Sequence, residues 1–524
     1  MCSITVNSAD EIETFRRHLP ESKYKFVDLV ERGRSDWLAS ACKAKVSCDV
    51  LVISAHYDGG NEFFSDRLEV SEFLTVTELE RASCSGSCPS LFAHLKEVYL
   101  FGCNTLNPEP QSSASAEIVR SLVRDGLTPK EAQRQLQSLP AAHGESSRDR
   151  MRQIFKDVPV IYGFSSTAPL GPTAASSLNR YFRTQGDREI AQGRPSNRLL
   201  EAFAAFGLSS ARGMTDKDAH AETRRDMCQF ADDRLSTATQ LAFVHQLLQR
   251  HFGEARLHLD RIQRLMAALD DRERQTPAVA QALEDIGRDA AARTRWLEQA
   301  RETEQPTVRV RLIDLARDVD WLSETERRQE LALMLRELLD HAIVGVPEVN
   351  LACSLNPSHQ LDGLLATAGA APVRDDVPHA GVRACLGDAA ARARTIEALV
   401  GPSEADVRVA QAYLRHRPIV DPAELRRVAR TIAGMEAGDA QARALEALAR
   451  QYVSDREVLQ MLTALFTRTP SWSVQSAIAA ILIRADRRSL AAPQLVRDLV
   501  AHRLPAPVAG DNIIDALIHT LQSH

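Results

Sequence analysis

The sequence predicts an α/β domain that is followed by an all-α region. Three observations support this division. Short runs of β-branched and aromatic residues alternate with helical patterns over roughly the first 205 residues. A helical pattern with a period of 34 residues runs through the last part of the chain. Residue usage also changes, because every lysine lies at or before Lys217 and Ala, Leu and Arg dominate beyond it. We therefore expect a doubly wound, mostly parallel sheet and then a stack of helices.

Four short apolar runs are the predicted strands of the sheet. Such runs are typical of strands that are buried on both faces of a parallel sheet. They are residues 26–30, 49–54, 97–101 and 158–162. Helical patterns at 114–124 and 148–155 separate the later strands. Sites in doubly wound sheets lie at the carboxyl ends of the strands, so the residues just after Ser54, Phe101 and Tyr162 are the first candidates.

The residues at two of these strand ends suit nucleophilic catalysis. His56 follows the second run and Cys103 follows the third. An imidazole beside a thiol can take its proton, and the thiolate attacks a carbonyl carbon far better than the thiol does. We expect Gly102 to leave room for a substrate. The backbone N–H of Cys103, with one from the turn that includes Tyr57 and Gly59, is the predicted oxyanion hole.

The segments that carry these residues resemble the caspase-like superfamily of cysteine peptidases, and within it the bacterial CHAT branch. They are residues 52–60, 98–106 and 160–171. Cys103 follows His56 by 47 residues, close to the spacing of about 50 that is noted for caspases. The resemblance covers about residues 20–205. It implies a caspase-like fold in which His56 is the general base and Cys103 is the nucleophile.

The sequence departs from the superfamily pattern in two places. Caspase-like enzymes usually have glycine directly after the histidine, where this chain has Tyr57, whose ring is expected to narrow the cleft. The residues around Cys103 also lack the caspase signature. Aspartate specificity is therefore not implied.

Four more polar residues are candidates with an ordinary structural alternative. Asp58 either orients His56 or is a turn residue before two glycines. Ser165, Ser166 and Thr167 follow the last predicted strand, where the superfamily shapes its substrate cleft; the alternative is a polar loop. Cys103 and His56 have ordinary alternatives too, as a small buried side chain and a strand-end residue.

Nine cysteines are spread along the chain. The N-terminus lacks the pattern of an export signal, so we expect reduced thiols and a cytoplasmic location. Cys84 and Cys88 raise the possibility of a metal site, with Cys42, Cys48 and His94 as further ligands. Zinc sites need a second ligand pair at regular spacing, which the chain lacks. We therefore expect no metal, and thiols or a conditional disulfide at these positions.

Composition and motifs exclude several other classes of protein. The net charge of −6 gives no basic surface for nucleic acid. No apolar run approaches the ~20 residues that span a bilayer. The chain also lacks the motifs of dinucleotide, nucleoside triphosphate and zinc peptidase sites. We expect no cofactor, no nucleic-acid partner and no membrane.

The region beyond the peptidase-like domain, 1–212, is predicted to be helical. It divides into a helical region at 213–345, an irregular connection at 346–401 and HEAT-like repeats at 402–524. Amphipathic helices with this period cannot bury their apolar faces alone and must stack. The positions aligned at 34-residue intervals are Tyr413, Ala447 and Ile481; Leu414, Leu448 and Leu482; Val428, Leu462 and Val496; and Ile432, Phe466 and Val500.

Together these features predict a cysteine endopeptidase that cleaves a protein through a Cys-His dyad, with the repeats binding a protein partner. The resemblance implies a role in bacterial defence or cell death, with a gasdermin-like pore-forming protein as substrate. The alternative is a catalytically silent adaptor in which the repeats bind proteins and the α/β domain supports them.

Overall fold

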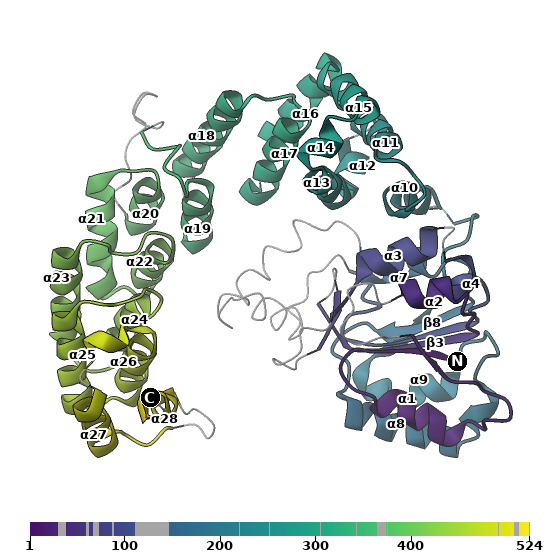
Figure 1. Ribbon diagram of the computed structural model, residues 1–524, viewed down its shortest axis with the longest axis horizontal. Coiled ribbons are helices and arrows are strands. Elements are labelled where there is room, and N and C mark those ends of the chain that lie inside the picture. Colours follow the sequence, from purple (N-terminus) through teal and green to yellow (C-terminus); the bar gives the residue numbers. More distant parts are fainter. Residues whose placement is uncertain are drawn as a thin grey trace. The chain divides into compact units, whose positions relative to one another are not determined.

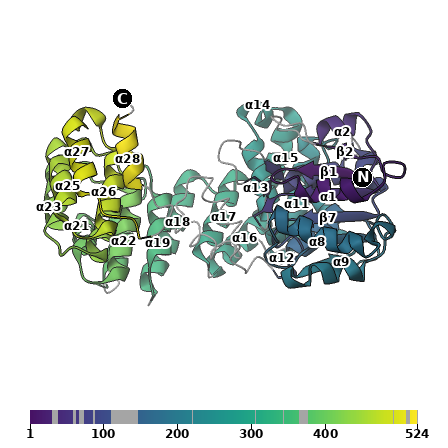
Figure 2. The same cartoon turned by 90° about the horizontal axis from the view of Figure 1, so that it is seen from below.

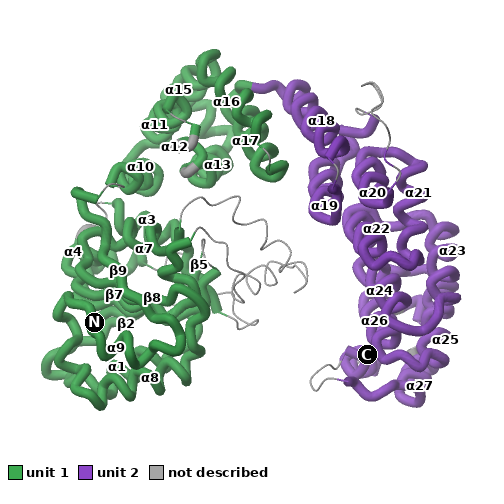
Figure 3. The backbone as a smooth tube through the Cα atoms, turned by 180° about the vertical axis from the view of Figure 1, so that it is seen from behind, with its two compact units in different colours: residues 1–321 green, residues 322–524 purple. Residues whose placement is uncertain are grey.

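A computed structural model gives the architecture of the chain (Figure 1). It describes residues 1–29, 38–58, 62–65, 73–85, 88–109, 146–218, 221–250, 252–303, 305–341, 343–363, 374, 376–490, 492–507 and 513–522. The chain divides into two compact units, residues 1–321 and 322–524 (Figure 3). The predicted order, a mostly parallel sheet followed by helices, is confirmed. The expected boundary at residue 212 lies inside the first unit.

The first unit contains a six-stranded sheet in the order β2-β1-β3-β7-β8-β9. The first five strands of this order are parallel, and β9 pairs with β8 in the antiparallel sense. The strands are β1 (Cys2–Thr5), β2 (Val27–Asp28), β3 (Val50–Ser54), β7 (Glu97–Phe101), β8 (Val160–Phe164) and β9 (Leu208–Ala211). All four predicted runs contain a strand. The fourth begins only after Pro159, which has no N–H to donate to a sheet.

Helices cover both faces of this sheet, so it is doubly wound (Figure 1). One layer consists of α1 (Asp10–His18), α8 (Gly171–Arg183) and α9 (Asn197–Ala202), and the other of α2 (Ala39–Lys43), α3 (Val76–Cys84), α4 (Pro89–Ala93) and α7 (Ser147–Ile154). Successive strand residues point to opposite faces. Leu51 and Ile53 accordingly join the core under α3, whereas Val50 and Val52 join the core under α1. The predicted helix at 114–124 falls outside the described residues.

A small antiparallel sheet, which the sequence reasoning did not predict, continues directly from β3. Its strands are β4 (His56–Tyr57), β5 (Glu62–Phe64) and β6 (Phe73–Thr75). Tyr57 is fully buried, and its ring centroid lies 4.6 Å from that of Phe63. This packing fixes the backbone directly after His56.

A group of helices completes the first unit. They are α10 (Ala221–Ala231), α11 (Thr237–Gln249), α12 (Phe252–Leu257), α13 (Leu259–Ala268), α14 (Asp271–Arg274), α15 (Pro277–Gly287), α16 (Ala290–Glu302) and α17 (Pro306–Asp318). α11 ends where the chain becomes extended at Arg250. A disulfide between Cys84 and Cys228 joins α10 to α3.

The second unit is helical in its described residues. Its helices are α18 (Glu324–Asp340), α19 (Val346–Leu355), α20 (Val377–Cys385), α21 (Ala389–Glu397), α22 (Glu404–His416), α23 (Pro422–Ala433), α24 (Asp439–Leu448), α25 (Arg456–Arg468), α26 (Trp472–Arg484), α27 (Ala492–His502) and α28 (Ile513–Gln522). The segment 346–401, expected to be irregular, thus contains three helices. Pro347 and Pro378 lie in first helical turns, where a missing N–H costs nothing, so they start helices rather than end them.

The repeat helices stack in two rows, α22-α24-α26 and α23-α25-α27 (Figure 1; Figure 2 shows the same unit from below). Buried glutamines confirm the 34-residue period: Gln441 Nε2 donates to the backbone oxygen of Ile432 (2.8 Å), and Gln475 Nε2 donates to that of Phe466 (3.1 Å). The alignment of the second helices is off by one residue at the last repeat, because Val500 is 51% exposed and Leu499 is buried.

Candidate functional site

Three neighbouring strands end side by side and present polar residues at the same level. The register pairs the last residue of β1 with the last residue of β3, and that residue with the last of β7. Two residues beyond these ends come Asn7, His56 and Cys103, respectively. Because the strands are parallel, their carboxyl ends share one edge of the sheet. The fold therefore brings together two chain segments that the sequence separates by 47 residues, and adds a third.

His56 and Cys103 line one small cavity of about 30 Å³. Its walls come from the ends of β1, β3 and β7, from the first turn of α1 and from the loop that precedes α8. The lining residues are Asn7, Ser8, Glu11, Ser54, Ala55, His56, Phe101, Gly102, Cys103, Ala168, Pro169, Leu170 and Gly171. The two residues singled out from the sequence thus face the same space.

Asn7 fixes the imidazole of His56. Its side-chain nitrogen lies 2.9 Å from His56 Nε2, and its oxygen lies 3.2 Å from the Ser65 hydroxyl. The two ends of an amide exchange by a half turn, and a hydroxyl satisfies either end. After that half turn, the amide oxygen of Asn7 takes the place of the nitrogen and accepts a hydrogen bond from the Nε2–H of His56. Nδ1 is then the nitrogen that can accept a proton from a thiol.

Cys103 is the cysteine that keeps a thiol. The other eight form the disulfides Cys2–Cys48, Cys42–Cys88, Cys84–Cys228 and Cys353–Cys385. The expectation of reduced thiols is therefore wrong for this structure, and Cys84 pairs with Cys228 rather than Cys88. Sequence spacing cannot show which cysteines meet, because packing between helices decides it. Among the described residues, no group of three or more His, Cys, Asp or Glu side chains could hold a metal ion.

The sulfur of Cys103 accepts a hydrogen bond from the backbone. The N–H of Ala168 donates to Sγ over 2.9 Å, and the side chain is 2% exposed. A hydrogen bond to the charged form of a group favours that form. The loop before α8 therefore stabilises negative charge on this sulfur.

Gly102 lines the cavity and also packs closely against the chain around β4. A Cβ at this position would lie 3.0 Å from Tyr57 Cβ and 3.1 Å from the backbone oxygen of Ala55. The space that a side chain would need here is therefore filled by the chain around β4, and the expected room for a substrate stays a prediction. The Tyr57 ring itself is buried against Phe63 and is not among the residues that line the cavity, so it does not narrow it.

Asp58 closes the turn between β4 and β5. Its Oδ1 accepts from the backbone N–H of Glu62 (3.0 Å), and its own N–H donates to the backbone oxygen of Glu62 (3.2 Å). These bonds favour the turn interpretation. Gly59, the other candidate in this turn, lies outside the described residues.

The predicted substrate-contact residues lie just before the loop that lines the cavity. The Ser165 hydroxyl donates to the backbone oxygen of Gly207 (3.2 Å), and the backbone oxygen of Ser166 accepts from Asn104 (2.8 Å). Ser166 and Thr167 are exposed. The lining is instead built by residues 168–171.

Sequence reasoning missed Asn7, Ser8 and Glu11 because it did not predict the short strand β1. The missed signal was the run Ser3-Ile4-Thr5-Val6, which alternates polar and apolar residues as a strand does. Only pairing with β3 makes this run a buried strand. Its end then supplies part of the cavity wall.

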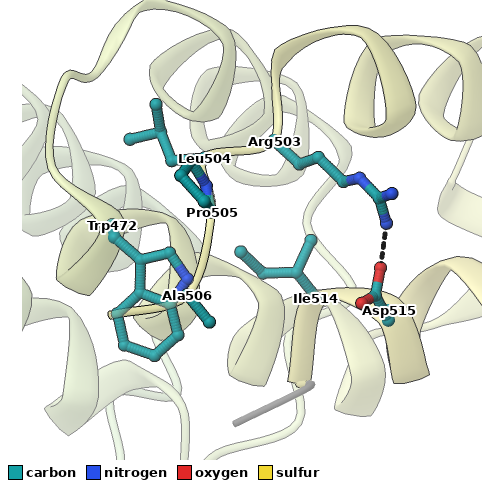
Figure 4. A pocket seen from close by; sticks show the side chains of 7 residues that line it. All are labelled: Trp472, Arg503, Leu504, Pro505, Ala506, Ile514 and Asp515. Carbon is teal, nitrogen blue, oxygen red and sulfur yellow. Dashed lines mark hydrogen bonds and ion pairs between the residues drawn. The ribbon is translucent and has the colours of Figure 1, made fainter. Parts of the chain in front are cut away.

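A larger pocket in the second unit lacks residues that suit catalysis. It has a volume of about 340 Å³ and is lined by Trp472, Arg503, Leu504, Pro505, Ala506, Ile514 and Asp515 (Figure 4). The two charged residues of this lining, Arg503 and Asp515, hydrogen-bond to each other. Nothing in this lining suits nucleophilic or acid–base chemistry.

Comparison with known proteins gives no family for this chain. No protein-family model, curated protein or solved structure matches it significantly. The doubly wound, mostly parallel sheet is compatible with a caspase-like fold.

Proposed function

We propose that the chain is a cysteine endopeptidase of the caspase-like type in which Cys103 and His56 carry the chemistry. The observation that carries the proposal is that both residues line one cavity at the carboxyl edge of the sheet. A backbone N–H already donates to the sulfur of Cys103, and Asn7 holds the imidazole of His56. A nucleophile, a base and a residue that orients the base are the parts that such a site needs.

The steps follow from this arrangement. The Cys103 proton passes to Nδ1 of His56, and the thiolate adds to the carbonyl carbon of the substrate. The N–H of Cys103 is the proposed donor to the oxyanion. The tetrahedral intermediate collapses, and the leaving amine takes the proton from His56. Water, deprotonated by the same imidazole, then hydrolyses the thioester to release the acid and restore the thiol.

The test is cleavage of a peptide library by Cys103→Ala and His56→Ala variants. We expect each substitution to abolish cleavage, because general-base assistance and the nucleophile are each lost. Cys385→Ala is the control, since that cysteine lies in the second unit and pairs with Cys353. Cleavage by C103A at the unaltered rate contradicts the proposal, provided that melting temperatures show both variants to be folded.

The silent adaptor is the second candidate, and the reactivity of Cys103 separates the two. The peptidase requires the thiol to be alkylated by iodoacetamide faster than an ordinary buried cysteine, and requires this rate to fall in His56→Ala. Equal rates in the two proteins favour the adaptor. The resemblance to the CHAT branch suggests a gasdermin-like pore-forming protein as the substrate and bacterial defence as the setting.

The repeats are the proposed binding surface for the protein partner. Val420 and Tyr452, 84% and 68% exposed, lie beside a groove of about 780 Å³ between repeats. Exposed apolar groups in a groove are typical of protein-binding sites. In the full chain, Val420→Ser with Tyr452→Ser should leave short-peptide cleavage unchanged and weaken capture of a protein partner by the inactive C103A chain.

The cytoplasmic location expected from the sequence remains a prediction. Among the described residues, no helix has the length and apolar character to cross a bilayer. The four disulfides weigh against a reducing compartment, because disulfides are rare in the cytosol.

A further inference from the structure

The cavity that holds the proposed dyad also contains a buried carboxyl group. Glu11 lies in the first turn of α1, directly after β1, and is 3% exposed. It lines the same cavity as His56 and Cys103. None of the steps proposed above uses it.

Among the described residues, no basic side chain pairs with the carboxyl group of Glu11. Its Oε2 atom is buried and has no hydrogen-bond partner among the described residues. No lysine or arginine is among the residues that line the cavity. Burial raises the pKa of Glu11 to about 7, and the residue's own N–H and the Ser54 hydroxyl offset only part of that shift. A buried carboxyl without a partner is costly, so an arriving cation would find a site already built for it.

The carboxyl group of Glu11 lies in the cavity where a substrate bound at Cys103 would place a side chain. It shares with Cys103 a cavity at the end of the sheet, and a substrate whose carbonyl reaches the sulfur places a neighbouring side chain there. Pro169 and Leu170 supply an apolar wall that suits the methylene stem of a long side chain. Resting on the proposed peptidase function, we infer that Glu11, assisted by the Ser54 hydroxyl, receives the basic side chain of a lysine or arginine that precedes the scissile bond.

The pocket must widen to admit such a side chain. Its volume of about 30 Å³ is too small for the side chain of a lysine or arginine. Leu170, at 59% exposed, is the wall residue with room to move. Gly171 holds the other end of this loop against α1, because a Cβ there would overlap the Ser8 hydroxyl and lie 2.6 Å from Asp10 Oδ2.

The first measurement is a peptide library that varies the residue before the scissile bond, cut by the full chain and by Glu11→Gln. We expect the unaltered protein to prefer Lys or Arg over their uncharged analogues norleucine and citrulline. Glu11→Gln should lower kcat/KM for the basic peptides about a hundredfold relative to kcat/KM for the uncharged peptides. Glu13→Gln, on the exposed face of the same helix, is the matched control and should behave as the unaltered protein.

The second measurement does not require cleavage. Acetyl-argininamide should slow the alkylation of Cys103 by iodoacetamide in the unaltered chain but not in Glu11→Gln, and acetyl-citrullinamide should protect neither. Protection without any peptide cleavage upholds the basic site and refutes the peptidase. Cleavage after uncharged or acidic residues, or a basic preference that survives in Glu11→Gln, overturns the basic site and leaves the peptidase standing. If the protein cleaves no peptide and acetyl-argininamide gives no protection, both the basic site and the peptidase function are refuted.

Discussion

The buried ion pair between Glu80 and Arg261 offers a sharp test of how the helices are fixed to the sheet. Arg261 Nη2 of α13 lies 2.6 Å from Glu80 Oε1 of α3, and the two side chains are 5% and 4% exposed. Removing one partner of a buried pair typically costs about 3–5 kcal/mol, because the other charge stays buried without compensation. Arg150 and Arg264 also lower the pKa of Glu80. We therefore expect Arg261→Met to cost about 3 kcal/mol, at the lower end of that range.

The pH dependence of this cost follows from the ionisation of Glu80. Burial alone would raise its pKa, but the nearby arginines, led by Arg261, hold the pKa below its ordinary value of 4.5. The ion pair therefore stabilises the unaltered protein at pH values above 4.5. Its contribution to the free energy of unfolding is lost as pH falls through the lowered pKa of Glu80. In Arg261→Met the strongest of the charges that lower the pKa of Glu80 is gone, so the effect of burial raises this pKa. The destabilisation should then be larger at pH 8 than at pH 5, because the raised pKa lets Glu80 of the variant take up a proton more readily as pH falls.

Urea denaturation of the first unit, followed through the Trp296 and Trp321 fluorescence at pH 5 and pH 8, measures this effect. Both tryptophans are buried in that unit. Arg288→Met is the control, because its partner Glu284 and Arg288 itself are largely exposed and such pairs contribute about 0–1 kcal/mol. Replacing both partners, as Glu80→Leu with Arg261→Met, should recover most of the loss. A double variant as unstable as Arg261→Met, or a loss independent of pH, would refute the reasoning.

Three further predictions concern the site, the thiols and the repeats. Asn7→Ala should lower kcat about tenfold to a hundredfold with little change in KM, because the base remains but is no longer oriented; a KM effect alone would assign Asn7 to substrate binding. Thiol titration of the unreduced, denatured chain should find one thiol, and nine after reduction; a count of nine before reduction contradicts the four disulfides. Leu448→Asp or Leu482→Asp should cost more than about 3 kcal/mol in the second unit, since each leucine is 1% or 2% exposed and its carboxylate replacement would be buried. Val500→Asp is the control and should be nearly neutral, because Val500 is 51% exposed, and full retention of the melting temperature in both leucine variants would show that the repeat was misaligned.

Local sequence patterns were sufficient where a short stretch of chain carries its own signal. The run Glu97–Phe101 coincides with β7, and all five of its residues are buried. A strand that is covered on both faces gives such a continuous run in the sequence. The 34-residue period placed Leu414, Leu448 and Leu482 in the core of the repeats. The pairing of His56 with Cys103 followed from one general rule, that parallel strands end at the same edge.

The tertiary structure decided what depends on contacts between distant segments. β1 is only four residues long and becomes a strand by pairing with β2 and β3, so Asn7 and Glu11 acquire their place at the cavity only in the folded chain. The loop at 168–171 reaches the sulfur of Cys103 across 65 residues of sequence. The disulfides join residues 32 to 144 positions apart. A sequence pattern shows which face of a single helix or strand is apolar. The segment that covers this face depends on how distant elements pack together, and a local pattern contains no information about that.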